Sequence, residues 1–202
     1  DVYKRQPQGW YRITETLKMK PDTKLIGLHP FGTQFRLDES TAAFSGFGGP
    51  KAMVESSEGG ANMLVGIGIN TGGYNYRAVG VKWMANADSY MNDVKFVGGH
   101  GGLWKPKPGV EEPRGRWNRP ARISSPDNPV AASGMDLAWD NQYWSLWVTN
   151  NGGGTFKDIW TASTYATNGF YANNTSTPGR IYAVSIEHHV RNEVRFNKVS
   201  NW

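Results

Sequence analysis

Apolar and polar residues alternate near the end of the chain, from Ile181 to Glu187. A period of two residues predicts a half-buried strand, because successive side chains of a strand point to opposite faces. The alternation places Tyr182, Val184 and Ile186 on the more apolar face, which we expect to contact the core. Glu187 then falls on the other face, which is turned toward solvent or a groove.

Short apolar runs separated by Gly and Pro continue through the rest of the chain and predict many strands joined by tight turns. The run from Asn62 to Ile69 has the continuous apolar character of a strand packed in a parallel sheet. Residues 8–19 have a helical pattern, and no other amphipathic helix of useful length follows. The sequence therefore predicts the all-β class, with sandwich, barrel and solenoid as alternatives. The other expected strands lie within residues 25–28, 35–37, 44–49, 52–55, 78–83 and 91–97.

A loosely repeated pentapeptide favours the solenoid. Asn92–Phe96 (NDVKF) is echoed by Asn192–Phe196 (NEVRF) and more weakly by Lys157–Trp160 (KDIW). Each copy combines an acidic, a β-branched and an aromatic residue, and a parallel β-helix needs such an aliphatic and aromatic pair to stack on the rung below. The spacing between copies is not constant, so the alternative is that these pentapeptides arise by chance in a β protein.

Composition narrows the chemistry. The chain has 202 residues, enough for one domain with a sizeable core. It has no cysteine, which excludes thiol catalysis, disulfides and Cys-ligated zinc. The 9 Trp, 9 Tyr and 8 Phe residues suit a β protein that offers aromatic surface to a ligand. The net charge is +5, and no apolar run approaches the roughly 18 residues of a membrane span, so we expect no membrane partner.

We expect both ends of the sequence to be cut. Residues 1–6 (DVYKRQ) resemble the adapter-derived hexapeptide found at the ends of metagenomic reading frames, and we leave them out of the fold interpretation. The chain stops at Trp202 directly after a strand-like run, and no signal peptide opens it. Residues 7–202 are therefore expected to form part of one domain of a longer bacterial protein.

The segment 101–129 differs from its surroundings, with six prolines, six basic residues and two tryptophans. Proline excludes a regular helix or strand here. We interpret the segment as a loop insertion that either forms a wall or lid over a groove or lies solvated at the surface. Basic charge with tryptophan also suits single-stranded nucleic acid. Because the prolines and Glu111 and Glu112 interrupt the basic patch, we expect no nucleic-acid partner.

The next segment, 135–148 (MDLAWDNQYWSLWV), combines residues that suit carbohydrate. The C–H faces of sugar rings stack on aromatic side chains, and sugar hydroxyls need amide and carboxylate partners. Alternation places Trp144 and Leu146 on one face and Tyr143 and Trp147 on the other. At least one of these faces is expected to belong to the core.

Three motifs together resemble the pectin-lyase-like parallel β-helix superfamily and, within it, glycoside hydrolase family 55, the β-1,3-glucanases. Asn92–Gly99 (NDVKFVGG) is similar to a rung motif of that family, and Asn141–Tyr143 (NQY) is similar to an element at its sugar-binding groove. Glu187-His188 is similar to the strand-end pair whose Glu is the general acid. An aromatic residue commonly follows that pair in the family, whereas His189 follows here. The resemblance covers residues 24–202 and implies a single-stranded right-handed parallel β-helix.

The resemblance also implies an inverting glycoside hydrolase, secreted and monomeric, acting on a polysaccharide such as β-1,3-glucan. Glu187 would protonate the glycosidic oxygen, which requires it to be protonated near neutral pH. A second carboxylate is needed, and Asp136, Asp140, Glu193 or a residue beyond Trp202 are the candidates. The expected substrate-binding residues are His100, Asp140, Asn141, Gln142, Trp144, His188 and His189.

Three alternatives remain open from the sequence. In the first alternative, Glu187 is a surface residue paired with a neighbouring Arg. The second is a polysaccharide lyase or pectin-active hydrolase on the same fold, although no Asp cluster is dense enough for the calcium cage of a lyase. The third is a non-catalytic carbohydrate-binding or adhesin protein. No metal or cofactor is expected, because adjacent histidines on a strand, such as His188 and His189, point to opposite faces.

Overall fold

The computed structural model describes residues 3–97, 142–162, 164, 166–187, 189 and 191–202. The regular structure of these residues is entirely β, in two sheets whose neighbouring strands pair in parallel. The expected all-β class and parallel pairing are therefore confirmed. The insertion expected at 101–129 lies outside the described residues.

We name the two sheets A and B. Sheet A contains β1 (Tyr3–Gln6), β2 (Gly9–Arg12), β4 (Lys24–Gly27), β5 (Thr33–Arg36), β7 (Met63–Val65), β8 (Gly68–Asn70), β10 (Tyr90–Phe96), β12 (Gly154–Ala162), β14 (Gly179–Tyr182) and β15 (Ser185–Glu187). Sheet B contains β3 (Leu17–Lys18), β6 (Lys51–Glu55), β9 (Ala78–Trp83), β11 (Gln142–Val148), β13 (Ala166–Thr175) and β16 (Asn192–Val199).

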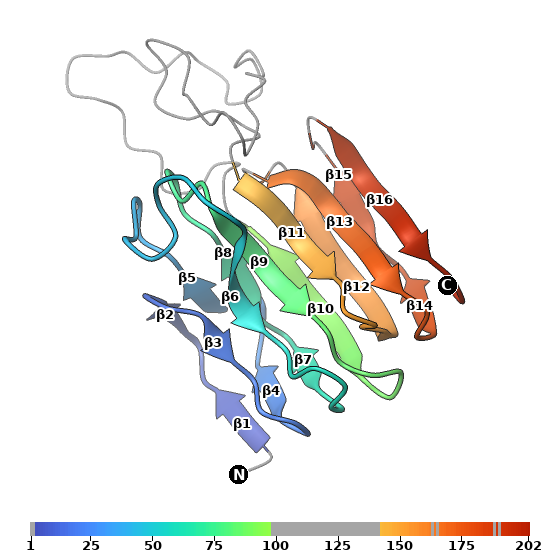
Figure 1. The fold of residues 1–202 in the computed structure, drawn as a ribbon. Helices are drawn as coiled ribbons and strands as arrows, with labels where there is room; N and C mark the ends of the chain where they lie inside the picture. The colour runs from blue at the N-terminus through green and yellow to red at the C-terminus, as the bar shows by residue number, and fades with distance from the viewer. Residues whose placement is uncertain (1–2, 98–141, 163, 165, 188, 190) are drawn as a thin grey trace, which may run out of the picture.

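The chain visits the two sheets in turn. One long strand or two short strands of sheet A are followed by one strand of sheet B, and we call this unit a rung. The strands of each rung pair with those of the next, so both sheets grow in the same direction, from β1–β3 to β14–β16 (Figure 1). The strands β10, β12 and β15 end, and β11, β13 and β16 begin, along one border of the sheets, which we call the turn edge.

The core lies between the sheets and is built from columns of apolar side chains, one per rung. In sheet A the strand registers align Leu64, Met91 and Phe156, and all three are fully buried. In sheet B they align Leu146 with Phe170 in the same way. Burial of each such side chain contributes about 1.5–3 kcal/mol to stability. Alignment of apolar residues in successive rungs therefore stabilises the fold.

A second column consists of residues in the left-handed backbone conformation. Gly66, Asp93, Asp158 and Ala183 occupy matching positions in successive rungs of sheet A. Their φ angles are 66°, 51°, 51° and 47°. Glycine adopts this conformation without strain and aspartate tolerates it, whereas alanine does not. Each of these residues bends its strand region and resets the alternation of side chains.

This corner corrects the expected alternation in the last strand of sheet A. The predicted strand is split at Ala183 into β14 and β15. Val184 and Ile186 pack against the core as predicted. Before the corner, however, Ile181 packs against the core and Tyr182 is 53% exposed, so their predicted faces are reversed. The split of Asn62–Ile69 into β7 and β8 at Gly66 has the same cause.

Two further expectations are wrong. Residues 8–19 form no helix but contain β2 and β3, because each pairs with a strand of the next rung and this pairing overrides the local pattern. Residues 44–49 form turns and bends, with Phe44 buried in the core. Residues 3–6, which the sequence interpretation leaves aside, form β1 and pair with β4.

The pentapeptide repeat is confirmed for two of its three copies. Val94 of the first copy pairs with Ile159 of the second, and Lys95 with Trp160, so the copies stack in register in sheet A. The third copy, Asn192–Phe196, lies in β16 of sheet B and is not a further member of that stack.

Candidate functional site

The outer face of sheet A carries the expected acid, Glu187, at the end of β15. Ile186 packs against the core, and the adjacent Glu187 side chain contacts β12 from the opposite face. The predicted orientation of Glu187, away from the core, is therefore confirmed. Parallel pairing with the end of β12 holds this part of β15 in place.

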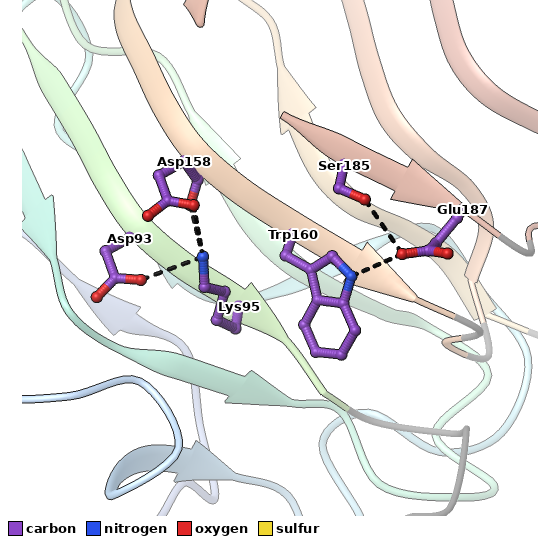
Figure 2. Close-up of polar contacts among 6 residues, drawn as sticks. All are labelled: Asp93, Lys95, Asp158, Trp160, Ser185 and Glu187. Carbon is purple, nitrogen blue, oxygen red and sulfur yellow. Dashed lines mark hydrogen bonds and ion pairs between the residues drawn. The ribbon is translucent and has the colours of Figure 1, made fainter. Parts of the chain in front are cut away.

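Two donors hold the Glu187 carboxylate. The indole Nε1 of Trp160 donates to Oε1 of Glu187 at 2.8 Å, and the hydroxyl of Ser185 donates to the same oxygen at 3.1 Å. Figure 2 shows both bonds, with Trp160 on β12 and Ser185 and Glu187 on β15. Since the donors come from two neighbouring strands, the half-buried carboxylate is fixed relative to the sheet.

An aromatic surface lies beside this carboxylate. The ring of Phe31 packs edge-on against Trp160, with centroids 5.9 Å apart. The ring of His29 in turn lies 5.8 Å from that of Phe31. Phe31 comes from the turn between β4 and β5 and is 49% exposed. The exposed part of the Phe31 ring offers an aromatic face near a carboxylate, a combination that suits a sugar ring.

A charged cluster lies farther back on the same face. Nζ of Lys95 contacts Oδ1 of Asp93 at 3.1 Å and Oδ1 of Asp158 at 2.8 Å (Figure 2), and it also donates to the backbone carbonyl of Asp158 at 3.1 Å. Only 13% of the Lys95 side chain is exposed. Both aspartates are corner residues, so the lysine bridges the corners of two successive rungs.

These groups form one polar strip across β10, β12 and β15, which we call the sheet A site: Asp93, Lys95, Asp158, Trp160, Ser185 and Glu187. Of the six, the sequence interpretation singles out Glu187 as functional. Asp158 and Trp160 appear in it as members of a repeat, and the stacking of that repeat could have placed them beside Glu187. Phe31 and His29 carry no such signal, because they lie in a turn distant in sequence.

His189, expected to bind substrate, is half-buried at the turn edge. Its Nε2 lies 2.6 Å from the hydroxyl of Thr161, and its Nδ1 lies 3.3 Å from the carbonyl oxygen of Ala166. Because a carbonyl can only accept, Nδ1 carries a proton in this contact. A Cβ atom at Gly169 would lie 2.6 Å from the imidazole, so this glycine makes room for the ring. His189 thus ties β12 to β13.

Glu193, one of the candidates for the second carboxylate, is also at the turn edge. Its Oε1 accepts a hydrogen bond from the backbone N–H of His189 at 3.3 Å. The carboxylate therefore contacts the segment that directly follows Glu187 and helps to fix the path of the chain from β15 to β16.

Gln142 and Trp144 lie on β11 in sheet B, and no contact joins them to the sheet A site within the described residues. Gln142 is 1% exposed and its Nε2 donates to the carbonyl of Gly72 at 2.7 Å, so the side chain supports the turn edge. The Trp144 ring packs against Trp147, with centroids 4.7 Å apart. Leu146 is buried in the core, so the expected sharing of one face by Trp144 and Leu146 is wrong.

The remaining expected site residues lie outside the part of the chain that the structure describes. They are His100, Asp136, Asp140, Asn141 and His188. Among the described residues, no group of three or more His, Asp or Glu side chains is arranged to hold a metal ion.

Comparison with known proteins identifies no family. No family model matches the sequence, and no curated protein matches it. The described residues contain no helix that is long and apolar enough to cross a membrane.

Proposed function

We propose that this protein binds a polysaccharide at the sheet A site and hydrolyses its glycosidic bonds with Glu187 as general acid. The observation that carries the proposal is the fixed position of the Glu187 carboxylate, held by Trp160 and Ser185 beside the exposed ring of Phe31. A carboxyl group positioned on a rigid strand next to an aromatic surface combines proton transfer with sugar stacking.

The fold that we propose is a single-stranded right-handed parallel β-helix of the pectin-lyase-like kind. The alternation of the two sheets along the chain supports it, as does the register of successive rungs. A right-handed path is favoured because about 98% of crossovers between parallel strands have that hand. The proposed fold, together with the three motifs that resemble the β-1,3-glucanases of family 55, makes β-1,3-glucan the first substrate to test. The same resemblance makes a secreted monomer the expected form of the protein.

In the proposed reaction, the Glu187 carboxyl donates its proton to the glycosidic oxygen as the bond from that oxygen to the sugar carbon breaks. Water attacks the same carbon from the opposite side and loses a proton to a second carboxylate, which inverts the configuration. Trp160 and Ser185 hold the acid in the orientation needed for the transfer. The departing sugar leaves with the proton, and the second carboxylate returns one to Glu187 through solvent.

Asp158 is a poor match for the second carboxylate. It lies one strand away from Glu187 and four residues farther back, which separates their Cα atoms by roughly 14 Å. Its carboxylate is also held by Lys95 at 2.8 Å. The carboxyl groups of inverting enzymes are about 6.5–9.5 Å apart, so the two side chains would have to lean toward each other to meet that distance. We therefore assign Asp158 to the positioning of substrate hydroxyls and assign only the acid among the described residues.

The test is the release of reducing sugar from laminarin, with pectin and homogalacturonan alongside, by the protein and by Glu187→Gln. The matched control is Glu58→Gln, an exposed glutamate in the turn after β6. Hydrolysis that is lost in Glu187→Gln and kept in Glu58→Gln, with binding unchanged, supports the proposal. Hydrolysis that survives in Glu187→Gln removes this residue from the mechanism. The anomer formed first, measured by NMR, decides between inversion and retention.

A second candidate function is non-catalytic carbohydrate binding. It is favoured by the engagement of the Glu187 carboxylate with two donors, an arrangement that also suits an acceptor for sugar hydroxyls. Binding of laminarin without release of reducing sugar would select this function. Activity on pectin or homogalacturonan alone would move the proposal to a pectin-active hydrolase or lyase, and an unsaturated product would identify the lyase.

A further inference from the structure

One residue from every strand of sheet B forms a continuous row on its outer face. The strand registers align Lys18 with Glu55, Glu55 with Lys82, Lys82 with Trp147, Trp147 with Tyr171 and Tyr171 with Arg195. The two aromatic residues of the row, Trp147 and Tyr171, are neighbours and are flanked by cations. Nζ of Lys82 lies 5.3 Å from the Trp147 ring centre, and the guanidinium carbon of Arg195 lies 5.2 Å from that of Tyr171.

A groove runs along the first part of this row, across β3, β6, β9 and β11. Its volume is about 390 Å³, within the range of about 300–1,000 Å³ that is typical of small-molecule sites. Figure 1 shows the four strands side by side in sheet B. The groove is lined by Lys18, Glu55, Lys82 and Trp147 of the row, together with Glu15 and Lys51 from the neighbouring loop and strand end.

The Trp147 ring is a rigid wall of this groove. Its Nε1 donates to Oδ1 of Asn173 at 2.7 Å, which fixes the indole from one side. The ring of Trp144 packs against it at 4.7 Å from the other, and Tyr171 packs against Trp144 at the same distance. An aromatic ring held by neighbours in this way loses little conformational freedom when a ligand stacks on it.

The charges in the groove are mixed in sign. Lys51 contacts Glu15 at 2.6 Å, which already pairs one lysine with one glutamate. Glu55 lies between Lys18 and Lys82 in the row. The lining therefore offers both donors and acceptors, rather than the single sign of charge that recognises a phosphate or a polybasic peptide. Neutral hydroxyl groups, which both donate and accept, match such a lining.

We propose that this groove is a second carbohydrate site, in which a neutral hexopyranose chain stacks on Trp147 and its hydroxyls bond to Glu55, Lys82 and Lys18. The site is on sheet B, whereas Glu187 is on sheet A, so the proposal goes beyond the function proposed above and does not require hydrolysis. With this second site the protein could hold one part of a polysaccharide while another part of the same polysaccharide occupies the sheet A site.

The experiment is a titration of the Glu187→Gln protein with laminarihexaose and cellohexaose, followed by NMR of the tryptophan indole N–H signals. The signal of Trp147 is assigned from its absence in Trp147→Phe, and that of Trp160 from Trp160→Phe. We expect a saturable shift of the Trp147 signal with at least one hexasaccharide. In Trp147→Ala, followed through the indole signal of the adjacent Trp144, we expect affinity at this site to fall about tenfold or more.

Two controls keep the outcome specific. Trp10→Ala removes a tryptophan that is 68% exposed on sheet A and should leave the Trp147 shift unchanged. Trp160→Phe tests independence, since a shift of Trp147 that persists in it identifies a separate site. A hexasaccharide that shifts only the Trp160 signal overturns the second site without affecting the function proposed for sheet A. Trigalacturonate, a charged sugar chain, is titrated alongside, and a Trp147 shift seen with it but with neither hexasaccharide overturns the neutral class of ligand.

Discussion

The indole Nε1 of Trp160 donates a hydrogen bond of 2.8 Å to Oε1 of Glu187 from the adjacent strand. The bond links successive rungs, so the position of the carboxylate depends on the stacking of β12 and β15. The residue that holds the proposed acid is also the residue on which Phe31 packs. Orientation of the carboxylate and the shape of the aromatic surface are therefore coupled.

Replacement of Trp160 by Phe should separate these two roles. Phe keeps an aromatic ring but removes the hydrogen-bond donor, and displacement of a catalytic group by about 1 Å can cost about 100-fold in rate. If that bond orients the acid for proton transfer, kcat should fall about 10- to 100-fold, with a smaller change in KM. Steady-state kinetics on whichever of laminarin, pectin and homogalacturonan the protein hydrolyses checks this, with Trp10→Phe as control. An unchanged kcat would contradict a positioning role for Trp160.

Removal of the charge at Lys95 should destabilise the fold. In Lys95→Met, Asp93 and Asp158 lose the cation that bridges them. Because both aspartates are partly exposed, we expect a loss of about 1–2 kcal/mol in the free energy of unfolding, measured by urea denaturation. Added salt should restore part of it by screening the two carboxylates. The control is Lys157→Met, which removes an exposed lysine of β12 and should change the free energy of unfolding little.

Substitution of Gly169 by Ala should be costly. The added Cβ would lie 2.2 Å from Cγ2 of Ile186 and 2.6 Å from Nε2 of His189. Both neighbours must move, so we expect a loss of about 1–3 kcal/mol in stability. The matched control is Gly49→Ala, where no heavy atom lies within 4 Å of the new Cβ. Equal melting temperatures for the two variants would show that His189 and Ile186 are not packed as described.

Substitution of Ala183 by Gly should instead stabilise the protein. Ala183 has a φ angle of 47°, a conformation that costs an L-residue about 1–2 kcal/mol, although glycine also raises the entropy of the unfolded chain. A net gain of up to about 1 kcal/mol is expected in chemical denaturation. Ala78→Gly, at a buried position within β9, should have the opposite sign. A loss of stability in both variants would argue against strain at the corner.

The sequence predicts the fold well where side chains repeat with the rungs. The apolar runs locate β4, β5, β6, β9 and β10, and the repeat anticipates the stacking of Val94 on Ile159. The errors cluster where the backbone turns. A left-handed position can be recognised in the sequence when the residue is a glycine, such as Gly66, but not when it is Ala183. The predicted alternation from Ile181 to Glu187 therefore continues through the corner at Ala183, where the actual alternation is reset.

The candidate site was predictable only in part for a related reason. Glu187 stands out because an acid lies beside a regular alternation. Its partner Ser185 lies on the same strand, but Trp160 comes from another rung. The register between rungs whose length varies cannot be counted along the sequence. Phe31 is an example, because it reaches Trp160 from a turn that the local pattern leaves undefined.

The column of left-handed corners has a consequence for how such a chain can change in length. Each rung has its bend at the same register position. Adding or removing a whole rung therefore keeps corner residues aligned with corner residues and core residues aligned with core residues. Adding one residue within a strand would instead bring an unsuited residue into the corner. Connections at the turn edge are under no such restriction. The one between β10 and β11 is far longer than the one between β12 and β13, yet the strands that follow both connections pair in register. That edge is therefore the place where new segments can be acquired without rebuilding the core.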